Sequence, residues 1–253
     1  MGAEGQLPPH VRAAWGIAGD ARRGRPAELS LPMIVGAATR LADEGGLAAV
    51  SMTSVAKSLG YSPMSLYRHV ASKEVLLELM VDDAFSAPPA EVPDGWRAGL
   101  RLWATRMMDD YTAHDWILDV PVSGPPMLPK ALTWMEWALG TLSGEPLAPL
   151  EQLSVLMLLS GYVRNEVSLA RGLERARRQR GITSGDEGEA YAAGLVQLVS
   201  ALPLPHLRSL IDDGLFEMPP GEARDEDSFM VDFGLERILD GIAALIDRRA
   251  GQN

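Results

Sequence analysis

The sequence contains no cysteine, and this absence excludes both a disulfide framework and a thiolate metal site. Histidine is also scarce, and the four residues are too scattered along the chain to predict a metal-binding cluster. They are His10, His69, His114 and His206. No run of 18 apolar residues is present, and no signal peptide opens the chain. We therefore expect a cytoplasmic protein with no membrane anchor, no resident metal and no cofactor.

The alternation of apolar and polar residues that marks a β-strand does not persist anywhere, and no internal repeat is apparent. Helical spacing, by contrast, recurs from residue 31 to the C-terminus, and it includes a helix at 190–201 after a polar loop at 182–188. With 253 residues, 47% of them hydrophobic, the chain can form one large domain or two small ones. The sequence thus predicts an all-α fold.

The stretch from Ser51 to Lys73 contains two short helical patterns joined by a tight turn. The first pattern carries a buried stripe at i, i+3, i+4 and i+7, and Gly60 follows it as a left-handed C-cap. Ser51 is expected to cap the first helix and Ser62 the second, with Pro63 at the first position of the second helix. The stripe consists of Met52, Val55, Ala56 and Leu59. This arrangement predicts a helix-turn-helix, whose second helix enters the DNA major groove.

The second helix of this motif is expected to bury Leu66 and Val70 and to present hydrogen-bonding and basic side chains outward. Such groups suit contacts to bases and phosphates. The outward residues are Met64, Ser65, Tyr67, Arg68 and His69. Ser30 and Ser72 are predicted to cap the helices before and after the motif. Taken alone, the pattern also fits an ordinary helical pair with a polar solvent face.

The segment from Arg22 to Phe85 resembles the DNA-binding domain of the TetR family of bacterial transcriptional regulators, in particular its actinobacterial members. The resemblance rests on the runs RGRPAELS (23–30), LPMIVGAATRLADEGG (31–46), SMTSVAKSLG (51–60) and SPMSLYRHVASKEVLLELM (62–80). It implies an N-terminal three-helix helix-turn-helix domain and a larger C-terminal helical domain for ligand binding and dimerisation. We therefore expect domains at 22–85 and 94–253, which follow a disordered tail at 1–21.

The resemblance also assigns residues to the DNA interface. Many family members carry an arginine on the outward face of the motif's first helix, where this chain has Thr53 and Ser54. That departure puts a strong guanine contact by this helix in doubt and leaves Lys57 as the nearest cation. The predicted DNA-binding residues are Arg23, Arg25, Thr53, Pro63, Met64, Ser65, Tyr67, Arg68, His69 and Lys73.

The net charge of −11 is unusual for a DNA-binding protein, but the charge is segregated along the chain. Residues 20–75 carry seven Lys and Arg against five Asp and Glu, whereas residues 76–253 carry 15 against 28. The basic run at 22–26 suits the minor groove, and it suits a solvated linker equally well. Lys73 begins a helix, where the helix dipole disfavours a cation, and this indicates a DNA phosphate as its partner.

Tryptophan and methionine are concentrated in the C-terminal part, where five of the six tryptophans lie between residues 96 and 137. Such side chains line adaptable apolar pockets, although at helical spacing they also form plain core. Family members bind small-molecule inducers in this domain, so the resemblance implies a site for a small hydrophobic effector. Its predicted residues are Trp103, Met107, Tyr111, Trp116, Trp134, Met135, Met157, Tyr162 and Asn165.

Two apolar helices predict a homodimer. The run LSVLMLLSGYV (153–163) is apolar almost all round, and the last helix, at 228–249, is apolar at regular helical spacing. The resemblance implies that these helices form a four-helix bundle with a second copy, and a twofold dimer matches a palindromic operator. Internal core is the alternative. The predicted interface comprises Leu153, Leu156, Ser160, Leu235, Ile238, Leu239, Ile242 and Leu245.

Two other functions fit parts of the sequence. Acidic pairs at 82–83, 109–110 and 212–213 suggest a metal-dependent all-α enzyme, but none continues into an aspartate-rich motif. Neither a phosphate-binding loop nor a nucleophile elbow occurs, so we expect no enzyme. The small basic excess also fits a helical ligand-binding or interaction protein that has lost specific DNA binding. The favoured interpretation is a ligand-responsive DNA-binding regulator, with repression as the family's usual mode.

Overall fold

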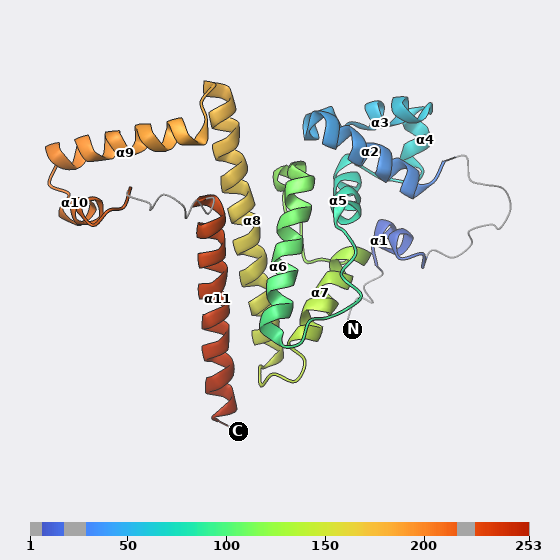
Figure 1. Ribbon diagram of the computed structural model, residues 1–253. Helices are drawn as coiled ribbons and strands as arrows, with labels where there is room; N and C mark the ends of the chain where they lie inside the picture. The colour runs from blue at the N-terminus through green and yellow to red at the C-terminus, as the bar shows by residue number, and fades with distance from the viewer. Residues whose placement is uncertain (1–6, 18–28, 217–225, 253) are drawn as a thin grey trace. The chain divides into compact units, whose positions relative to one another are not determined.

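The computed structural model describes residues 7–17, 29–216 and 226–252 (Figure 1). Every regular element in these ranges is a helix and none is a strand, which confirms the predicted all-α fold. The chain divides into two compact units, one formed by residues 1–164 with 242–253 and the other by residues 165–241. The long helices α8 and α11 contribute to both units.

The helices of the first unit can be followed by their labels in Figure 1. Its N-terminal part comprises α1 (Pro9–Ala14), α2 (Leu31–Gly45), η1 (Leu47–Ala49), α3 (Met52–Leu59), α4 (Pro63–Tyr67) and α5 (Lys73–Ala84). It continues with α6 (Trp96–Ala113), η2 (Asp115–Asp119), α7 (Pro129–Thr141), the beginning of α8 (Pro149–Arg180) and the end of α11 (Glu226–Ala250). We refer to α2–α5 as the N-terminal cluster.

A hydrophobic core holds the N-terminal cluster together. Helix α2 packs against both α3 and α5, and side chains from all four helices are fully buried there. The same core includes Trp116, Ile117 and Leu128, which lie beyond the Pro-rich break at 86–93. The break in composition therefore does not coincide with a break in packing, and residues after it complete the core of the helices before it.

Three of the four predicted serine caps are confirmed. The hydroxyls of Ser30, Ser51 and Ser72 each accept a hydrogen bond from the backbone N–H three residues later. Ser62 occupies the predicted N-cap position of α4, but its hydroxyl makes no capping bond to the backbone and lies 3.0 Å from the hydroxyl of Ser65. Pro63 has no N–H to satisfy, so the first turn of α4 needs less capping.

The expectation of a disordered tail at residues 1–21 is wrong for residues 7–17. Helix α1 buries Val11 in the core of the N-terminal cluster, with 1% of its surface exposed. His10 lies 3.2 Å from the carboxylate of Glu78 on α5, and the indole of Trp15 donates to the carbonyl of Met127 at 2.8 Å. One apolar anchor and two polar contacts thus order a helix too short to be stable alone.

We expect Val11→Ala to lower the free energy of unfolding by about 1.5 kcal/mol, because it removes two buried methyl groups at about 0.8 kcal/mol each. Urea denaturation followed by circular dichroism measures this change. The neighbouring Arg12 is exposed and provides the control, since Arg12→Ala should leave the midpoint in place. Equal stability of the two variants would show that α1 does not dock.

Polar contacts join the end of α5 to α6 and α7. The carboxylate of Asp82 accepts the backbone N–H groups of Lys130 at 3.2 Å and of Ala131 at 2.8 Å, and so caps α7 from another helix. Burial raises the pKa of Asp82, although these two N–H groups act in the opposite direction. The hydroxyl and N–H of Ser86 both donate to Asp110 of α6. The end of α5 is therefore bonded to α7, and the start of the connection that follows it is bonded to α6.

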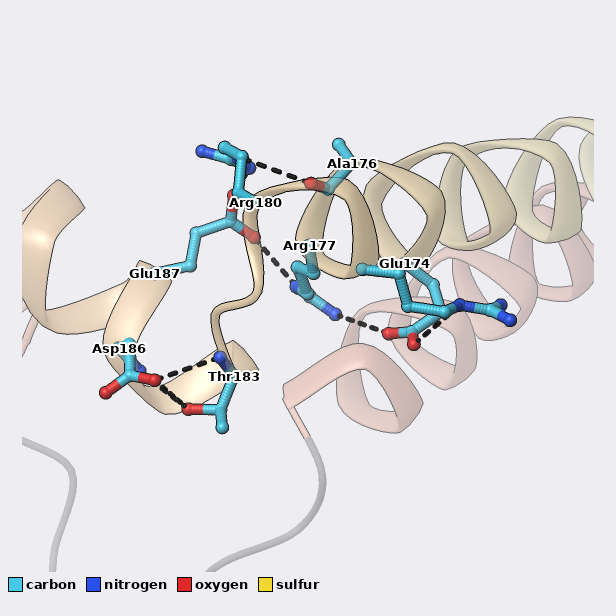
Figure 2. A network of polar contacts seen from close by, with 8 residues as sticks. Glu174, Ala176, Arg177, Arg180, Thr183, Asp186 and Glu187 are labelled. Atoms are coloured by element: carbon cyan, nitrogen blue, oxygen red, sulfur yellow. Dashed lines mark hydrogen bonds and ion pairs between the residues drawn. The ribbon is translucent and has the colours of Figure 1, made fainter.

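The second unit contains the end of α8, helices α9 (Ser184–Ala201) and α10 (Pro205–Asp212), and the beginning of α11. The predicted loop at 182–188 is wrong from residue 184 onward, because Thr183 and Asp186 form a capping box that starts α9 early (Figure 2). Glu187 pairs with Arg177 at 2.7 Å and with Arg180, and these hydrogen bonds lower its pKa. The corner between α8 and α9 is thus fixed by charge.

Candidate DNA interface and effector domain

Helices α3 and α4 are joined by a three-residue turn that begins with Gly60. This glycine has φ +76° and ψ +23°, the left-handed conformation that glycine adopts without a Cβ clash. Leu66 on α4 and Val70, three residues after the end of α4, pack into the core, since neither has any exposed surface. They fix the position of α4. The predicted helix-turn-helix is present, and its second helix is held from one side only.

The outer side of α4 is open to solvent. Met64 is 72% exposed and Tyr67 46%, and Arg68 and His69 are exposed as well. Pro63 and Ser65 are half-buried beside them. The hydroxyl of Ser65 lies 3.0 Å from that of Ser62. A short helix with its apolar side fully buried and these groups outward has the surface that major-groove contact requires.

Helix α3 offers less to a DNA duplex than α4 does. Thr53 and Lys57 are exposed on it, as predicted from the helical spacing. Ser54, however, is not free on this face, because its hydroxyl donates to the carbonyl of Ala49 at 2.8 Å and accepts the N–H of Ser51. Ser54 therefore completes the capping box of α3, whereas Thr53 and Lys57 remain exposed.

Lys73 lies at the first position of α5, directly after the capping residue Ser72. Its side chain is half-buried, next to the N-terminal end of a twelve-residue helix. Both the helix dipole and the lysine charge attract an anion at this end. The other predicted basic contacts, Arg23 and Arg25, lie outside the described residues.

Several predicted effector-site residues lie on α6 and α7, which pack against each other. Trp103, Met107 and Trp134 are buried, with 3–7% of their surfaces exposed. Tyr111 and Met135 are half-buried, and the ring of Tyr111 contacts Phe85 edge-on at 5.5 Å. We refer to these five residues as the effector-domain core; Tyr111 also packs against the core of the N-terminal cluster.

Four other predicted residues are not brought into that group. Trp116 is buried in the core of the N-terminal cluster, and Met157 is 76% exposed on α8. Tyr162 is half-buried on the same helix, and Asn165 is exposed and belongs to the second unit. Two surface depressions lie among the described residues, and none of the predicted effector residues lines either of them. One is lined by residues 94–98, 101, 102 and 105, and the other by residues 202–205, 208, 209 and 212.

No sequence pattern predicted a polar connection between α2 and the segment after α6. One oxygen of Asp43 accepts the indole N–H of Trp116 at 2.7 Å and lies 2.8 Å from Nδ1 of His114. Arg164 of α8 donates to the carbonyl of Leu118 at 2.9 Å in the same segment, η2. Side chains 73 residues apart in sequence meet here, and no local pattern predicts such a pair.

The predicted dimer residues differ in how accessible they are. Leu156, Leu235, Leu239 and Ile242 are buried within the single chain, so they are not available to a partner as predicted. Ile238 and Leu245 are half-buried, and Leu153 and Ser160 are exposed. Helix α8 exposes further apolar side chains that the prediction missed, although its all-round apolar sequence indicated them. They include Leu150, Met157 and Leu158, exposed at 75%, 76% and 54%.

No helix in the three described ranges is long and apolar enough to span a membrane. The absence of such a helix agrees with the lack of an 18-residue apolar run in the sequence.

Comparison with known proteins gives matches over nearly the whole chain. The model of bacterial regulatory proteins of the tetR family matches residues 34–80, and that of the tetracyclin repressor-like C-terminal domain matches residues 88–246. The HTH-type transcriptional repressor DrrR1 of Streptomyces coeruleorubidus is 33% identical over 252 residues, which cover 98% of this chain and 90% of that protein. ActR of Streptomyces coelicolor in complex with actinorhodin superposes with a TM-score of 0.69 at 25% identity, covering 88% of this chain and 99% of ActR.

Proposed function

Because the chain belongs to the TetR family of bacterial regulatory proteins, we propose that it is a repressor that binds a palindromic operator as a dimer and is released by a small hydrophobic effector. The observation that carries this proposal is the surface of α4. Leu66 and Val70 fix its inner side, and Met64, Tyr67, Arg68 and His69 are presented outward together. A repressor of this kind acts in the cytoplasm, on the bacterial chromosome.

Repression is supported by the relative named a repressor, which aligns along almost the entire chain. Dimerisation is supported by the exposed apolar residues of α8, Leu150, Leu153, Met157 and Leu158. A single chain leaves them in water, whereas a twofold partner that presents the same helix would bury them. One motif contacts one half-site, so a dimer also supplies the second reading helix that a palindrome needs.

The effector-domain core of Trp103, Met107, Tyr111, Trp134 and Met135 supports binding of an apolar molecule. An effector releases DNA only if it binds the DNA-incompetent conformation more tightly than the competent one. The contacts of Asp43 with η2 and of Asp82 with α7 provide routes by which such a change reaches the N-terminal cluster. ActR binds actinorhodin, so actinorhodin is the first probe for release.

The test is binding of the purified protein to the DNA upstream of its own gene and of neighbouring genes, at two salt concentrations. We expect sequence-selective binding that weakens at higher salt, because phosphate contacts release counterions. Tyr67→Ala should reduce affinity at least about tenfold, and Lys73→Ala should lower the salt slope by about one. Tyr191, 62% exposed on α9, is the control for loss of a surface tyrosine.

Selective binding that survives both Tyr67→Ala and Lys73→Ala would place the interface elsewhere on the protein. No selective binding by the wild type would favour the second interpretation, a ligand-binding protein that has lost its operator. The small basic excess of residues 20–75 is the feature that favours that second interpretation.

A further inference from the structure

The indole N–H of Trp103 is buried and has no hydrogen-bond acceptor among the described residues. Trp103 lies in the middle of α6 with 5% of its surface exposed, and its nitrogen is closed off from solvent. Buried N–H groups in folded proteins are almost always paired, so each exception needs an explanation.

Four of the other five indoles donate a hydrogen bond within the protein. Trp15 donates to the carbonyl of Met127 at 2.8 Å, and Trp116 donates to Asp43 at 2.7 Å. Trp134 donates to the carbonyl of Ser86 at 2.8 Å, and Trp137 to the carbonyl of Pro89 at 3.0 Å. Trp96, the fifth, is half-buried at a surface depression. Among the tryptophans of the described residues, Trp103 is therefore the one whose N–H is both buried and unpaired.

A buried donor without an acceptor destabilises the folded protein, because it loses its hydrogen bond to water and gains none. Phenylalanine would fill most of the same space and carry no such cost. The donor is therefore useful only if an acceptor reaches it in another state of the protein. Its place among Met107 and Trp134, in the effector-domain core, indicates that this acceptor arrives with the effector.

We propose that Trp103 is a specificity-determining residue whose indole N–H binds a carbonyl or quinone oxygen of the effector. This inference rests on the proposed function, in which an apolar molecule enters the core between α6 and α7. The effector class is an aromatic or polycyclic ketone or quinone, whose rings replace the apolar contacts of the core and whose oxygen accepts the buried, unpaired indole N–H of Trp103.

Entry of such a molecule requires the core to open, and the residues beside Trp103 permit this. Met107 lies one turn further along the same face of α6, and Met135 lies on α7. Methionine side chains have three rotatable bonds and repack around different shapes at low cost. Gly99, one turn before Trp103, is packed tightly against Thr141, so we expect that end of the helix pair to stay closed.

The test uses Trp103→Phe, with Trp137→Phe as the matched control. Trp137 has a paired N–H, and its ring contacts that of Trp134 at 5.9 Å, so the control removes an indole from the same surroundings without touching the unpaired donor. Thermal unfolding without any added compound is measured first. We expect Trp103→Phe to keep or raise the unfolding midpoint, because no hydrogen bond is lost. Trp137→Phe should lower the midpoint, because the carbonyl of Pro89 loses its donor.

Binding of 9-fluorenone and of fluorene is then measured by equilibrium dialysis at low micromolar concentration. The two compounds share a tricyclic skeleton and differ in one carbonyl oxygen. The wild type and Trp137→Phe should bind fluorenone at least about tenfold more tightly than fluorene, the value of one buried hydrogen bond. Trp103→Phe should bind the two compounds equally.

The inference is overturned if the wild type binds fluorenone no better than fluorene or not at all, or if Trp103→Phe keeps the preference. A fall of the Trp103→Phe midpoint equal to that of Trp137→Phe would also overturn it, since the N–H would then be paired in the free protein. Operator binding without any compound is measured on the same samples. If operator binding holds and the preference is absent, this inference alone fails; if the preference holds without operator binding, the regulator proposal alone fails.

Discussion

Replacing Leu66 with alanine should lower the free energy of unfolding by about 2–5 kcal/mol, the usual cost of a large-to-small change in a closed core. Leu66 has no exposed surface, and it is one of two side chains that attach the five-residue helix α4 to the N-terminal cluster. So short a helix has little stability of its own, so its position depends on this packing. Urea denaturation followed by circular dichroism gives the free energy directly.

The matched control is Met64→Ala on the opposite side of the same helix. Met64 is 72% exposed, so its removal should change the free energy of unfolding by less than about 0.5 kcal/mol. We expect Met64→Ala to weaken operator binding while the protein stays folded, and Leu66→Ala to weaken both. If the two variants were equally stable, the packing of Leu66 would not be what holds α4 on the N-terminal cluster.

Asp43→Ala should give the second large effect, a loss of about 2 kcal/mol in stability. Its carboxylate receives two donors from the segment after α6, and Trp116 is only 1% exposed. Once the carboxylate is gone, the buried indole has no acceptor, and the penalty is that of an unsatisfied donor. The half-exposed pair with His114 adds little, because water screens it.

Asp43→Asn separates the hydrogen bond from the charge, because an amide oxygen still accepts the indole. We expect Asp43→Asn to recover most of the stability that Asp43→Ala loses. The free energy of unfolding of both variants and of the neighbouring exposed Glu44→Ala tests this. A loss in Asp43→Asn as large as that in Asp43→Ala would show that charge, and not the acceptor for Trp116, holds the two segments together.

Local sequence patterns predicted the helices, the helix-turn-helix and most of the caps. Met52, Val55 and Ala56 were expected on one buried stripe and are buried, and Gly60 takes the left-handed conformation expected of it. These features depend on residues within one or two turns of each other. Their physical causes, side-chain period and backbone conformation, are therefore visible in a short stretch of sequence.

Features that depend on distant residues were not predicted. Trp116 was expected in an effector pocket because tryptophans commonly line such pockets. It is buried in the core of the N-terminal cluster, where its indole donates to Asp43 of α2, 73 residues earlier in the chain. Ser62 takes the predicted N-cap position, but its hydroxyl pairs with the hydroxyl of Ser65 and not with a backbone N–H. Helix α9 began six residues early because Thr183 and Asp186 cap each other, a box that the polar composition of the segment concealed.

The DNA-contact and dimer residues were predicted from different kinds of sequence signal. The positions on α4 follow from the motif and remain predictions of contact, since exposure alone names no partner. The dimer positions show why burial cannot be assigned from hydrophobicity: Leu156 and Met157 are adjacent in an apolar run, yet one is 5% and the other 76% exposed. The chain's own folding determines which of two neighbouring apolar residues is left for a partner.

Residues 11, 116, 117 and 128 share one core with the N-terminal cluster. This shared core limits how the cluster can be exchanged between related proteins. A hybrid regulator made by exchanging α2–α5 between two relatives would replace one side of this core and keep the other. The grafted helices would then meet a foreign tryptophan, isoleucine and leucine, and mismatched volumes in a packed interior cost stability. Exchange of DNA specificity between such proteins is therefore more tractable through the exposed side chains of α4, which share no packing with the rest, than through transplantation of the whole cluster.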